Sequence, residues 1–267
     1  MKVAWIGMGR VGTRMALRVL HAGYDLTGHA RTVGKYAEIA AAGGRLEPSL
    51  AAVVSDAEIV CVNVYSEAQL RDAMFDGGAL AAMRSGSILV VHSTIEPAIL
   101  GELARSRTDI AVLDAPFSGT DEDADAGKIT LMVGGDAAAL AIAKPVLSTY
   151  ADFIVHIGPP GTGIMLKLIN NVLFGANILL ASDALGILTS QGVDREVAIQ
   201  AMARSSSGSF ALDRLRGPNT PDEIVKAVWP YMAKDVAAAR TAASDMGFDL
   251  GRLGAATMPY LNDPSLG

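Results

Sequence analysis

Apolar residues along the first 160 positions recur in two alternating patterns. Short runs typical of buried strands lie at 3–6, 58–64, 87–92, 110–114, 129–133 and 153–157, with a weaker run at 24–29. Apolar positions with helical spacing fill the intervals, ending first near Gly23 and then lying at 35–44, 67–75, 98–105 and 136–148. Strands that alternate with helices predict a mostly parallel sheet with helices on both faces, so residues 1–160 are expected to form one α/β domain.

The pattern changes at Gly161, after which the sequence contains no convincing strand. Residues 163–190 form one long helical pattern that is apolar on nearly every side, and shorter helical patterns follow at 194–203, 221–246 and 251–261. We expect the pattern at 221–246 to break near Pro230. Residues 161–267 therefore predict an all-helical second domain. Because a helix that is apolar all round must be buried, we expect the long helix to pack against a second copy, in a homodimer or homotetramer.

Composition narrows the classes of protein that remain. The chain has 267 residues, of which 51% are hydrophobic, and its net charge of −6 comes without a basic cluster, which disfavours nucleic-acid binding. Its single cysteine, Cys61, excludes a disulfide framework. The N-terminal apolar run is too short for a signal peptide, and the apolar residues 171–181 are too few and too interrupted to span a membrane. We therefore expect a cytoplasmic protein that has no membrane partner.

Three glycines follow the first apolar run with the spacing Gly7-x-Gly9-x-x-Gly12, and a helical pattern begins directly after them. Strand, glycine turn and helix in this order are the context in which the spacing indicates dinucleotide binding. Gly7 permits the sharp turn, Gly9 lets the backbone approach a pyrophosphate, and Gly12 lets helix and strand pack closely. The candidate cofactor-binding residues of this glycine loop are Gly7, Met8, Gly9, Arg10, Val11 and Gly12. The first domain is thus predicted to be a Rossmann-type, doubly wound α/β sheet.

The segment after the second strand indicates which dinucleotide binds. NAD-specific sites usually carry Asp or Glu about 20 residues past the glycines, on the ribose 2′-hydroxyl. Here no acid stands at that place, and Arg31 and Thr32 follow it. Because a guanidinium and a hydroxyl suit a 2′-phosphate, the sequence predicts NADP, with NAD as the alternative cofactor. The competing interpretation of Arg31 is a solvated loop arginine.

Other candidates lie where strands end, because open α/β sheets bind ligands at the carboxyl edge. Val64 ends one strand and is a candidate cofactor contact, and Ser93 and Thr94 follow the next strand. A hydroxyl at 93 or 94 is expected to cap the following helix, and it can also lie near the nicotinamide. Residues 121–127, which are acidic and small, have the composition of a solvated surface loop.

Lys167 is the most informative polar residue, because it stands inside the long apolar helix. Asn171 lies four residues further along and therefore shares its face. The two side chains can hold a hydroxyl or carbonyl oxygen, and burial would make the lysine a usable general acid and base. The alternative is a lysine near the helix start whose head reaches water.

Lys234-Asp235 is a weaker candidate, which competes with the interpretation of a plain surface ion pair. The four histidines show no metal-ligand spacing, and neither a Ser-His-Asp arrangement nor an HExxH motif occurs. His29 and His92 lie near strand ends, but a contact with a cofactor is not expected. The sequence predicts no metal site.

Five stretches occur in the order found in one known family. They are the glycine loop, Ser93-Thr94-Ile95-x-Pro97, Asp114-Ala115-Pro116-x-Ser118-Gly119, Gly161-x-Gly163-x-x-x-Lys167-x-x-Asn170-Asn171, and Lys234-Asp235. Through them the chain resembles the β-hydroxyacid dehydrogenases, the group of 3-hydroxyisobutyrate dehydrogenase, tartronate semialdehyde reductase and the glyoxylate/succinic semialdehyde reductases. The resemblance extends from residue 1 to about residue 246.

The resemblance implies hydride transfer between NADP(H) and a short β-hydroxy acid or semialdehyde, with Lys167 as the catalytic acid and base. It implies that the substrate is held by Ser118, Gly119, Thr120 and Asn171, and that Thr94 and Lys234 contact the cofactor. It also implies that the long helix contributes to dimerisation. NADP-preferring members of the family carry Asn-Arg-Thr after the second strand, and Arg31 and Thr32 keep two of these three residues.

The chain departs from the family pattern in three ways. Thr120 stands where the family usually has a second glycine, the following segment is unusually acidic, and the chain ends soon after Lys234-Asp235. A β-branched side chain at 120 is expected to narrow the substrate pocket. Two alternatives share the architecture: an imine reductase, which generally has another residue in place of Lys167, and a non-catalytic cofactor-binding protein.

Overall fold

The computed structural model describes residues 1–262, except for the side chain of Val33. The chain forms two compact units, Met1–Lys167 and Leu168–Gly267. The division lies inside the long helix, whereas the sequence places it at residue 160. Within the part that the structure describes, all strands belong to the first unit.

The first unit contains a nine-stranded sheet in the order β3-β2-β1-β4-β5-β6-β8-β7, with β9 paired to β8. The strands are β1 (Lys2–Ile6), β2 (Asp25–His29), β3 (Arg45–Glu47), β4 (Ile59–Val62), β5 (Ile88–Val91), β6 (Ala111–Asp114), β7 (Phe117–Ser118), β8 (Ile129–Gly134) and β9 (Ala151–Gly158). The strands β1 to β6 run parallel to one another, whereas β8 runs antiparallel to β6 and β7. The predicted Rossmann-type α/β fold is confirmed.

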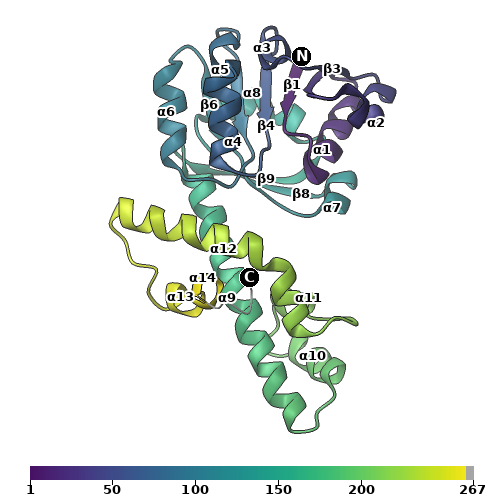
Figure 1. Cartoon of the computed structure of the whole chain (residues 1–267), viewed down its shortest axis with the longest axis vertical. Helices are drawn as coiled ribbons and strands as arrows, with labels where there is room; N and C mark the ends of the chain where they lie inside the picture. The colour runs from purple at the N-terminus through teal and green to yellow at the C-terminus, as the bar shows by residue number, and fades with distance from the viewer. Residues whose placement is uncertain (263–267) are drawn as a thin grey trace. The chain divides into compact units, whose positions relative to one another are not determined.

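Helices connect the strands (Figure 1). They are α1 (Arg10–His21), η1 (Val33–Tyr36), α2 (Ala37–Ala41), α3 (Leu50–Val54), α4 (Glu67–Arg71), η2 (Asp72–Asp76), α5 (Ala79–Ala82), α6 (Ala98–Ser106), α7 (Asp121–Asp125) and α8 (Ala137–Leu147). Residues Val3 to Ile6 of β1 are all at most 2% exposed, although successive side chains of a strand point to opposite faces. Helices therefore cover both faces of the sheet, as the continuous apolar runs predict.

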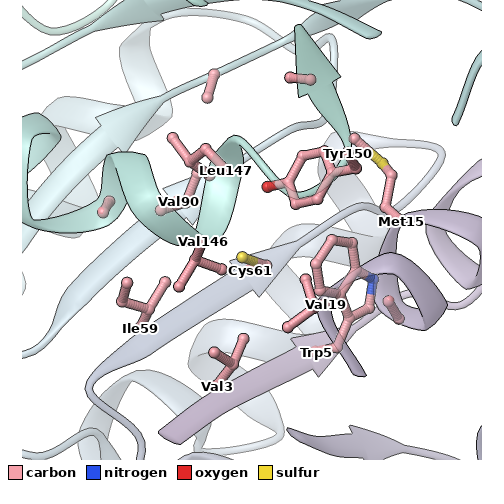
Figure 2. Packing of buried hydrophobic residues seen from close by; sticks show 14 of the residues in the cluster. Val3, Trp5, Met15, Val19, Ile59, Cys61, Val90, Val146, Leu147 and Tyr150 are labelled. Carbon is pink, nitrogen blue, oxygen red and sulfur yellow. The ribbon is translucent and has the colours of Figure 1, made fainter. Parts of the chain in front are cut away.

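The core on one face joins β1, β4 and β5 to α1 and α8 (Figure 2). Its members include Val3, Trp5, Met15, Val19, Ile59, Cys61, Val90, Val146, Leu147 and Tyr150. The ring of Trp5 meets Tyr150 edge-on, with the ring centroids 5.8 Å apart. Burial raises the pKa of the Cys61 thiol to about 12, so this cysteine stays protonated and acts as a small apolar residue.

A buried polar pair closes this core. His92 Nδ1 lies 2.7 Å from the carbonyl oxygen of Ala115. Because a carbonyl oxygen can only accept a hydrogen bond, the imidazole proton resides on Nδ1. The other ring nitrogen, Nε2, therefore accepts from the Tyr150 hydroxyl at 3.0 Å. Burial lowers the pKa of His92 to about 4, which keeps the imidazole neutral. His92 therefore has a structural role in the core.

Several segments of the first unit differ from the sequence prediction, which did not include β3, β7, α3 or α5. The helix expected at 35–44 is a 3₁₀ turn, η1, followed by the five-residue α2. Of the loop expected at 121–127, residues 121–125 form the helix α7, which the capping box of Thr120 and Asp123 starts. Neither Ser93 nor Thr94 caps the next helix: Pro97 is the N-cap of α6, and it makes no side-chain cap hydrogen bond.

The described part of the second unit is helical, as predicted. Its helices are the C-terminal part of α9 (Thr162–Ser190), α10 (Arg195–Ala203), α11 (Phe210–Arg214), α12 (Pro221–Met246), α13 (Gly251–Ala256) and α14 (Pro259–Asn262). The break expected near Pro230 is wrong, because α12 continues through it. A proline removes one backbone hydrogen bond, and the buried residues Val225, Met232 and Val236 on either side keep the helix packed.

Helix α9 is long and apolar enough, by length and composition, to cross a membrane. The sequence-based judgement that its apolar stretch is too short is therefore wrong, because the helix continues well beyond residues 171–181. One such helix is weak evidence for a membrane span, since the long helix of a soluble protein meets the same criteria. The helix also exposes Leu173, Leu180 and Ile187, which recur every seven residues, and we name these three the apolar stripe.

Candidate active site

The glycine loop joins the end of β1 to the start of α1. Gly7 has φ +92°, and a Cβ there would lie 2.2 Å from the backbone oxygen of Asn63. A Cβ on Gly12 would lie 2.3 Å from the Gly7 oxygen. Gly9 differs from both, because a Cβ on it would meet no atom within 4 Å. The first and third glycines are thus required by the fold, whereas the second borders open space.

The start of α1 is suited to an anion. Its N-cap, Gly9, provides no side-chain hydrogen bond, and the first turn of this fully described helix contains no acidic residue. The first backbone N–H groups of a helix have no partner inside the helix, and the helix dipole favours negative charge there. The residues present therefore fit the pyrophosphate of a dinucleotide, which would lie in the open space beside Gly9.

Basic residues follow β2, the strand beside β1. Ala30 is buried and its N–H donates to the Glu47 oxygen at 3.0 Å, whereas Arg31 and Thr32 are exposed. Burial lowers the pKa of the neighbouring His29, and the positive charge of Arg31 lowers it further. Lys35, which the sequence analysis missed, lies in the same connection with its ammonium 5.5 Å from the Tyr36 ring centroid. Its proximity to Arg31 in the sequence was the available signal.

The ends of β4 and β5 lie beside the glycine loop, because these strands pair in the order β1-β4-β5. The Val64 N–H donates to Ser93 Oγ at 2.9 Å and so ties the two strand ends together. Thr94, the next residue, is half-buried. Met8 is buried, with its sulfur 2.9 Å from where a Cβ on Gly28 would lie. The predicted cofactor residues Met8, Val64 and Thr94 are therefore on the same edge of the sheet as the glycine loop.

The substrate loop predicted at 118–120 begins with Ser118, the last residue of the short strand β7. Ser118 pairs with Thr130 of β8, and Gly119 has φ +143°, where a Cβ would lie 2.6 Å from Ile129 Cδ1. The hydroxyl of Thr120 lies 3.1 Å from Asp123 Oδ2, and Asp123 Oδ2 also accepts from the Thr120 N–H at 2.8 Å. The threonine that departs from the family pattern thus has a structural role as the N-cap of α7.

The acidic residues of α7 are largely neutralised by partners. Asp121 pairs with Arg10 at 2.7 Å and Asp125 lies 3.7 Å from Arg14, while Asp123 caps its own helix. Glu122, the fourth acidic residue of the segment 121–127, is exposed. Most carboxylates of residues 121–125 therefore have local partners, and they do not surround the substrate loop with uniform negative charge.

Lys167 is half-buried in the second turn of α9, and the start of that helix is fixed by a buried carboxylate. Asp114, at the end of β6, is fully buried and accepts from the N–H groups of Gly161 and Ile164, both at 2.8 Å. Burial raises the pKa of Asp114, and these backbone hydrogen bonds oppose the rise. A Cβ on Gly163 would lie 2.9 Å from Asp114 Oδ2, so the helix start fits closely over this carboxylate.

The second unit brings the remaining candidates together. Asn171 Nδ2 donates to Asp235 Oδ2 at 2.6 Å, and Asn171 Oδ1 accepts from Asn170 Nδ2 at 3.2 Å. Asp235 is 4% exposed and its Oδ1 lies 3.4 Å from Lys234 Nζ. The interpretation of Lys234-Asp235 as a plain surface pair is therefore wrong. Asp235 orients the Asn171 amide, and no pattern in the sequence predicted this role, because only tertiary packing brings the two residues into contact.

No group of three or more His, Cys, Asp or Glu side chains that could hold a metal ion occurs among residues 1–262. Within the first unit, the carboxyl edge of the sheet carries the open helix start beside Gly9, the hydroxyls of Ser93 and Thr94, and the exposed cations Arg10 and Arg31. Such a set can bind a dinucleotide along the edge of the sheet. These features define a dinucleotide-binding protein of the Rossmann class.

Known protein families match both parts of the chain. Residues 2–158 match the NAD binding domain of 6-phosphogluconate dehydrogenase, and residues 161–261 match the family described as NAD-binding of NADP-dependent 3-hydroxyisobutyrate dehydrogenase. The chain belongs to the β-hydroxyacid dehydrogenase family and is an NAD(P)-dependent dehydrogenase of that type.

Individual relatives agree with this assignment. The chain is 34% identical to the NAD-dependent L-serine dehydrogenase of Pseudomonas aeruginosa, over 79% of this chain and 72% of that one. A 3-hydroxyisobutyrate dehydrogenase from Salmonella typhimurium has a TM-score of 0.82 at 27% identity, over 97% of this chain and 93% of that one. The 3-hydroxyisobutyrate dehydrogenase of Mycobacterium tuberculosis, solved with L-serine, has a TM-score of 0.85 at 24% identity, over 97% and 92% of the two chains.

The glycine loop gives a prediction that separates folding from binding. Gly9→Val should leave the melting temperature unchanged and weaken NADPH and NADH binding about tenfold or more, because the side chain fills the phosphate space and removes charge-assisted hydrogen bonds. Gly12→Ala should instead lower the free energy of unfolding by about 1–3 kcal/mol, because its Cβ collides with backbone. Thermal melts and fluorescence titration measure the two effects. If the Gly9→Val variant still binds the dinucleotide tightly, the glycine loop does not bind the pyrophosphate.

Proposed function

We propose that the protein transfers hydride between NADP(H) and a short β-hydroxy acid or semialdehyde, with Lys167 as the acid and base. When bound, the nicotinamide supplies or accepts the hydride. The chain supplies the rest: the glycine loop binds the pyrophosphate, residues 118–120 and Asn171 hold the substrate, and Lys167 exchanges a proton with the substrate oxygen. The observation that carries the proposal is the half-buried lysine on a helix whose start is fixed by Asp114.

Lys167 can contribute in two ways during reduction of an aldehyde. The carbonyl carbon gains the hydride, its oxygen gains negative charge, and the ammonium of Lys167 donates the proton that completes the alcohol. A cation placed at the developing negative charge also stabilises the transition state electrostatically. The reverse direction needs the neutral amine, which accepts the proton of the substrate hydroxyl.

The names of three relatives support the proposed substrate class. Those named for L-serine, 3-hydroxyisobutyrate and 2-(hydroxymethyl)glutarate act on molecules that share a hydroxymethyl group one carbon away from a carboxylate. We propose the same unit as the reacting part of the substrate here. A panel of these three acids, the corresponding short semialdehydes and glyoxylate, followed by NADPH absorbance, identifies the substrate. A cyclic imine belongs in the panel, because turnover of the imine alone would favour the imine reductase alternative.

Two substitutions of Lys167 separate its two contributions. Lys167→Ala should lower kcat about 10²–10⁴-fold through lost proton transfer, with the loss of the cation adding to it. Lys167→Arg keeps the cation but cannot give up its proton near neutral pH, so it should recover part of the loss and no more. Stopped-flow measurement of NADPH oxidation provides the rates.

The matched control is Lys144→Ala, which removes an exposed lysine of α8 in the same unit. Its kcat should equal that of the unmodified protein, and all three variants should bind NADPH normally. Near-normal turnover by Lys167→Ala would mean that another group moves the proton.

We propose NADP as the preferred cofactor because Arg31 and Thr32 are exposed directly after β2 and no acid occupies the place of the NAD-specific carboxylate. Lys35 adds a second cation in the same connection. A guanidinium and a hydroxyl can together hold a 2′-phosphate, which only NADP carries. The named preference of the L-serine dehydrogenase relative is for NAD, so both cofactors need to be compared directly.

Arg31→Ala tests the cofactor preference. It should lower kcat/KM for NADPH by about 10–100-fold, the value of a hydrogen bond to a charged group, and leave kcat/KM for NADH within about twofold. Arg84→Ala, which removes an exposed arginine before β5, is the matched control and should change neither value. If the unmodified protein already uses NADH more efficiently than NADPH, the proposed role of Arg31 is wrong.

We also propose that the apolar stripe of α9 is covered by a second copy of this chain. Leu173, Leu180 and Ile187 are 51%, 58% and 66% exposed, and their spacing of seven places them along one side of the helix. Burying side chains of this kind contributes roughly 1.5–3 kcal/mol each, which gives association a driving force.

Leu180→Glu should shift the protein toward monomer, because the new carboxylate would have to be buried at the interface. Ile142→Glu is the matched control, since Ile142 is similarly exposed at 57% but lies on α8. Light scattering at micromolar concentration measures the mass. A monomeric unmodified protein would count against the proposed interface.

A further inference from the structure

An ion pair joins the glycine loop to the segment that follows the substrate loop. Arg10 Nη2 lies 2.7 Å from Asp121 Oδ1, and Arg10 Nε lies 3.3 Å from Asp121 Oδ2, so the guanidinium meets the carboxylate at two points. The side chain of Arg10 is 80% exposed and that of Asp121 is 26% exposed. The Arg10 guanidinium lowers the pKa of Asp121, so the carboxylate is charged near neutral pH.

Asp121 directly follows the substrate loop, residues 118–120, in the chain. It is the first residue of α7, whose N-cap is Thr120, and the capping box of Thr120 and Asp123 fixes the loop to the helix. The helix lies against α1 (Figure 1), its Ala124 is fully buried, and Asp125 lies 3.7 Å from Arg14. A change in the pairing of Asp121 therefore acts directly on residues 118–120.

Arg10 is also the first residue of α1, and so it stands at the helix end that fits a pyrophosphate. A guanidinium forms paired hydrogen bonds with phosphate as readily as with carboxylate, and it uses the same edge for both. A bound pyrophosphate would place negative charge beside Asp121. The pyrophosphate and the Asp121 carboxylate then compete for the Arg10 guanidinium, and the two negative charges repel each other.

We propose that Asp121 is a positioning residue that competes with the cofactor pyrophosphate for Arg10 and so links dinucleotide binding to the substrate loop. In the free protein Asp121 holds Arg10 and keeps α7 against the glycine loop. When a dinucleotide binds, Arg10 pairs with a phosphate oxygen, the contact with Asp121 is lost, and residues 118–120 become free to adjust to the substrate. The inference requires dinucleotide binding alone and depends neither on NADP preference nor on the role of Lys167.

The test is a double-mutant cycle on dinucleotide affinity, with NADPH and NADH as probes. Asp121→Asn should tighten both dissociation constants by about two- to fivefold, the range of a partly exposed ion pair. Arg10→Ala should weaken both by about tenfold or more. In the Arg10→Ala background, Asp121→Asn should have a clearly smaller effect. Because the two cofactors share the pyrophosphate, the factors should be the same for both.

Asp125→Asn is the matched control, because it removes the same charge from the same helix but from a longer contact with Arg14. It should change both dissociation constants less than Asp121→Asn does. Equal tightening by the two variants would mean that the charge of α7 acts without any pairing to Arg10. Unchanged or weaker binding by Asp121→Asn would also overturn the proposal, since it would show that Asp121 supports Arg10 in binding the cofactor.

Hydrogen exchange tests the link to the loop separately. The N–H groups of Ala124 and Ala126 donate to the oxygens of Thr120 and Glu122, both at 3.0 Å, and report the integrity of α7. Saturating NADH should speed their exchange in the unmodified protein and have no further effect in Asp121→Asn, where exchange should already be faster. Slower exchange with NADH in both proteins would show that α7 tightens on binding, which contradicts the proposed release.

Discussion

The site depends on the hydrogen bonds that the buried carboxylate of Asp114 accepts from the backbone. Asp114 stands at the end of β6 and accepts hydrogen bonds from the first turn of α9, so it fixes where that helix begins. A buried carboxylate is tolerated only when hydrogen bonds and favourable dipoles replace its water, and a helix N-terminus supplies both. The glycines at 134 and 163 are required around it, because a Cβ at either position would lie less than 3 Å from a carboxylate oxygen.

This constraint connects the sheet to the proposed chemistry. The ends of β1, β4 and β5 carry the glycine loop, Val64 and Thr94, and β6 carries Asp114, so a single edge of the sheet holds the dinucleotide site and sets the start of α9. Lys167 follows Ile164, which donates to Asp114, by less than one helical turn. The position of the lysine is therefore determined by the sheet edge that would bind the cofactor.

Much of the fold could be predicted from the sequence because its signals are local. The glycine spacing, the apolar strand runs and the long apolar helix each depend on neighbouring residues, and the structure confirms the Rossmann-type sheet and the helical second unit. The α7 helix also had a local signal, the Thr120–Asp123 capping box, which its acidic composition obscured. The contacts of Asp235 with Asn171, and of His92 with Tyr150, join residues 64 and 58 positions apart, and no pattern along the chain reveals them.

Transfer of a deuterium label tests the central claim most directly. The protein is given NADPH that carries deuterium at the transferable C4 position, together with a short semialdehyde from the substrate panel, and the product is examined by mass spectrometry. The account predicts a β-hydroxy acid with one deuterium on its hydroxymethyl carbon, formed by the unmodified protein and nearly absent with Lys167→Ala. Oxidation of the cofactor without deuterium in the product, or equal product with both proteins, would contradict it.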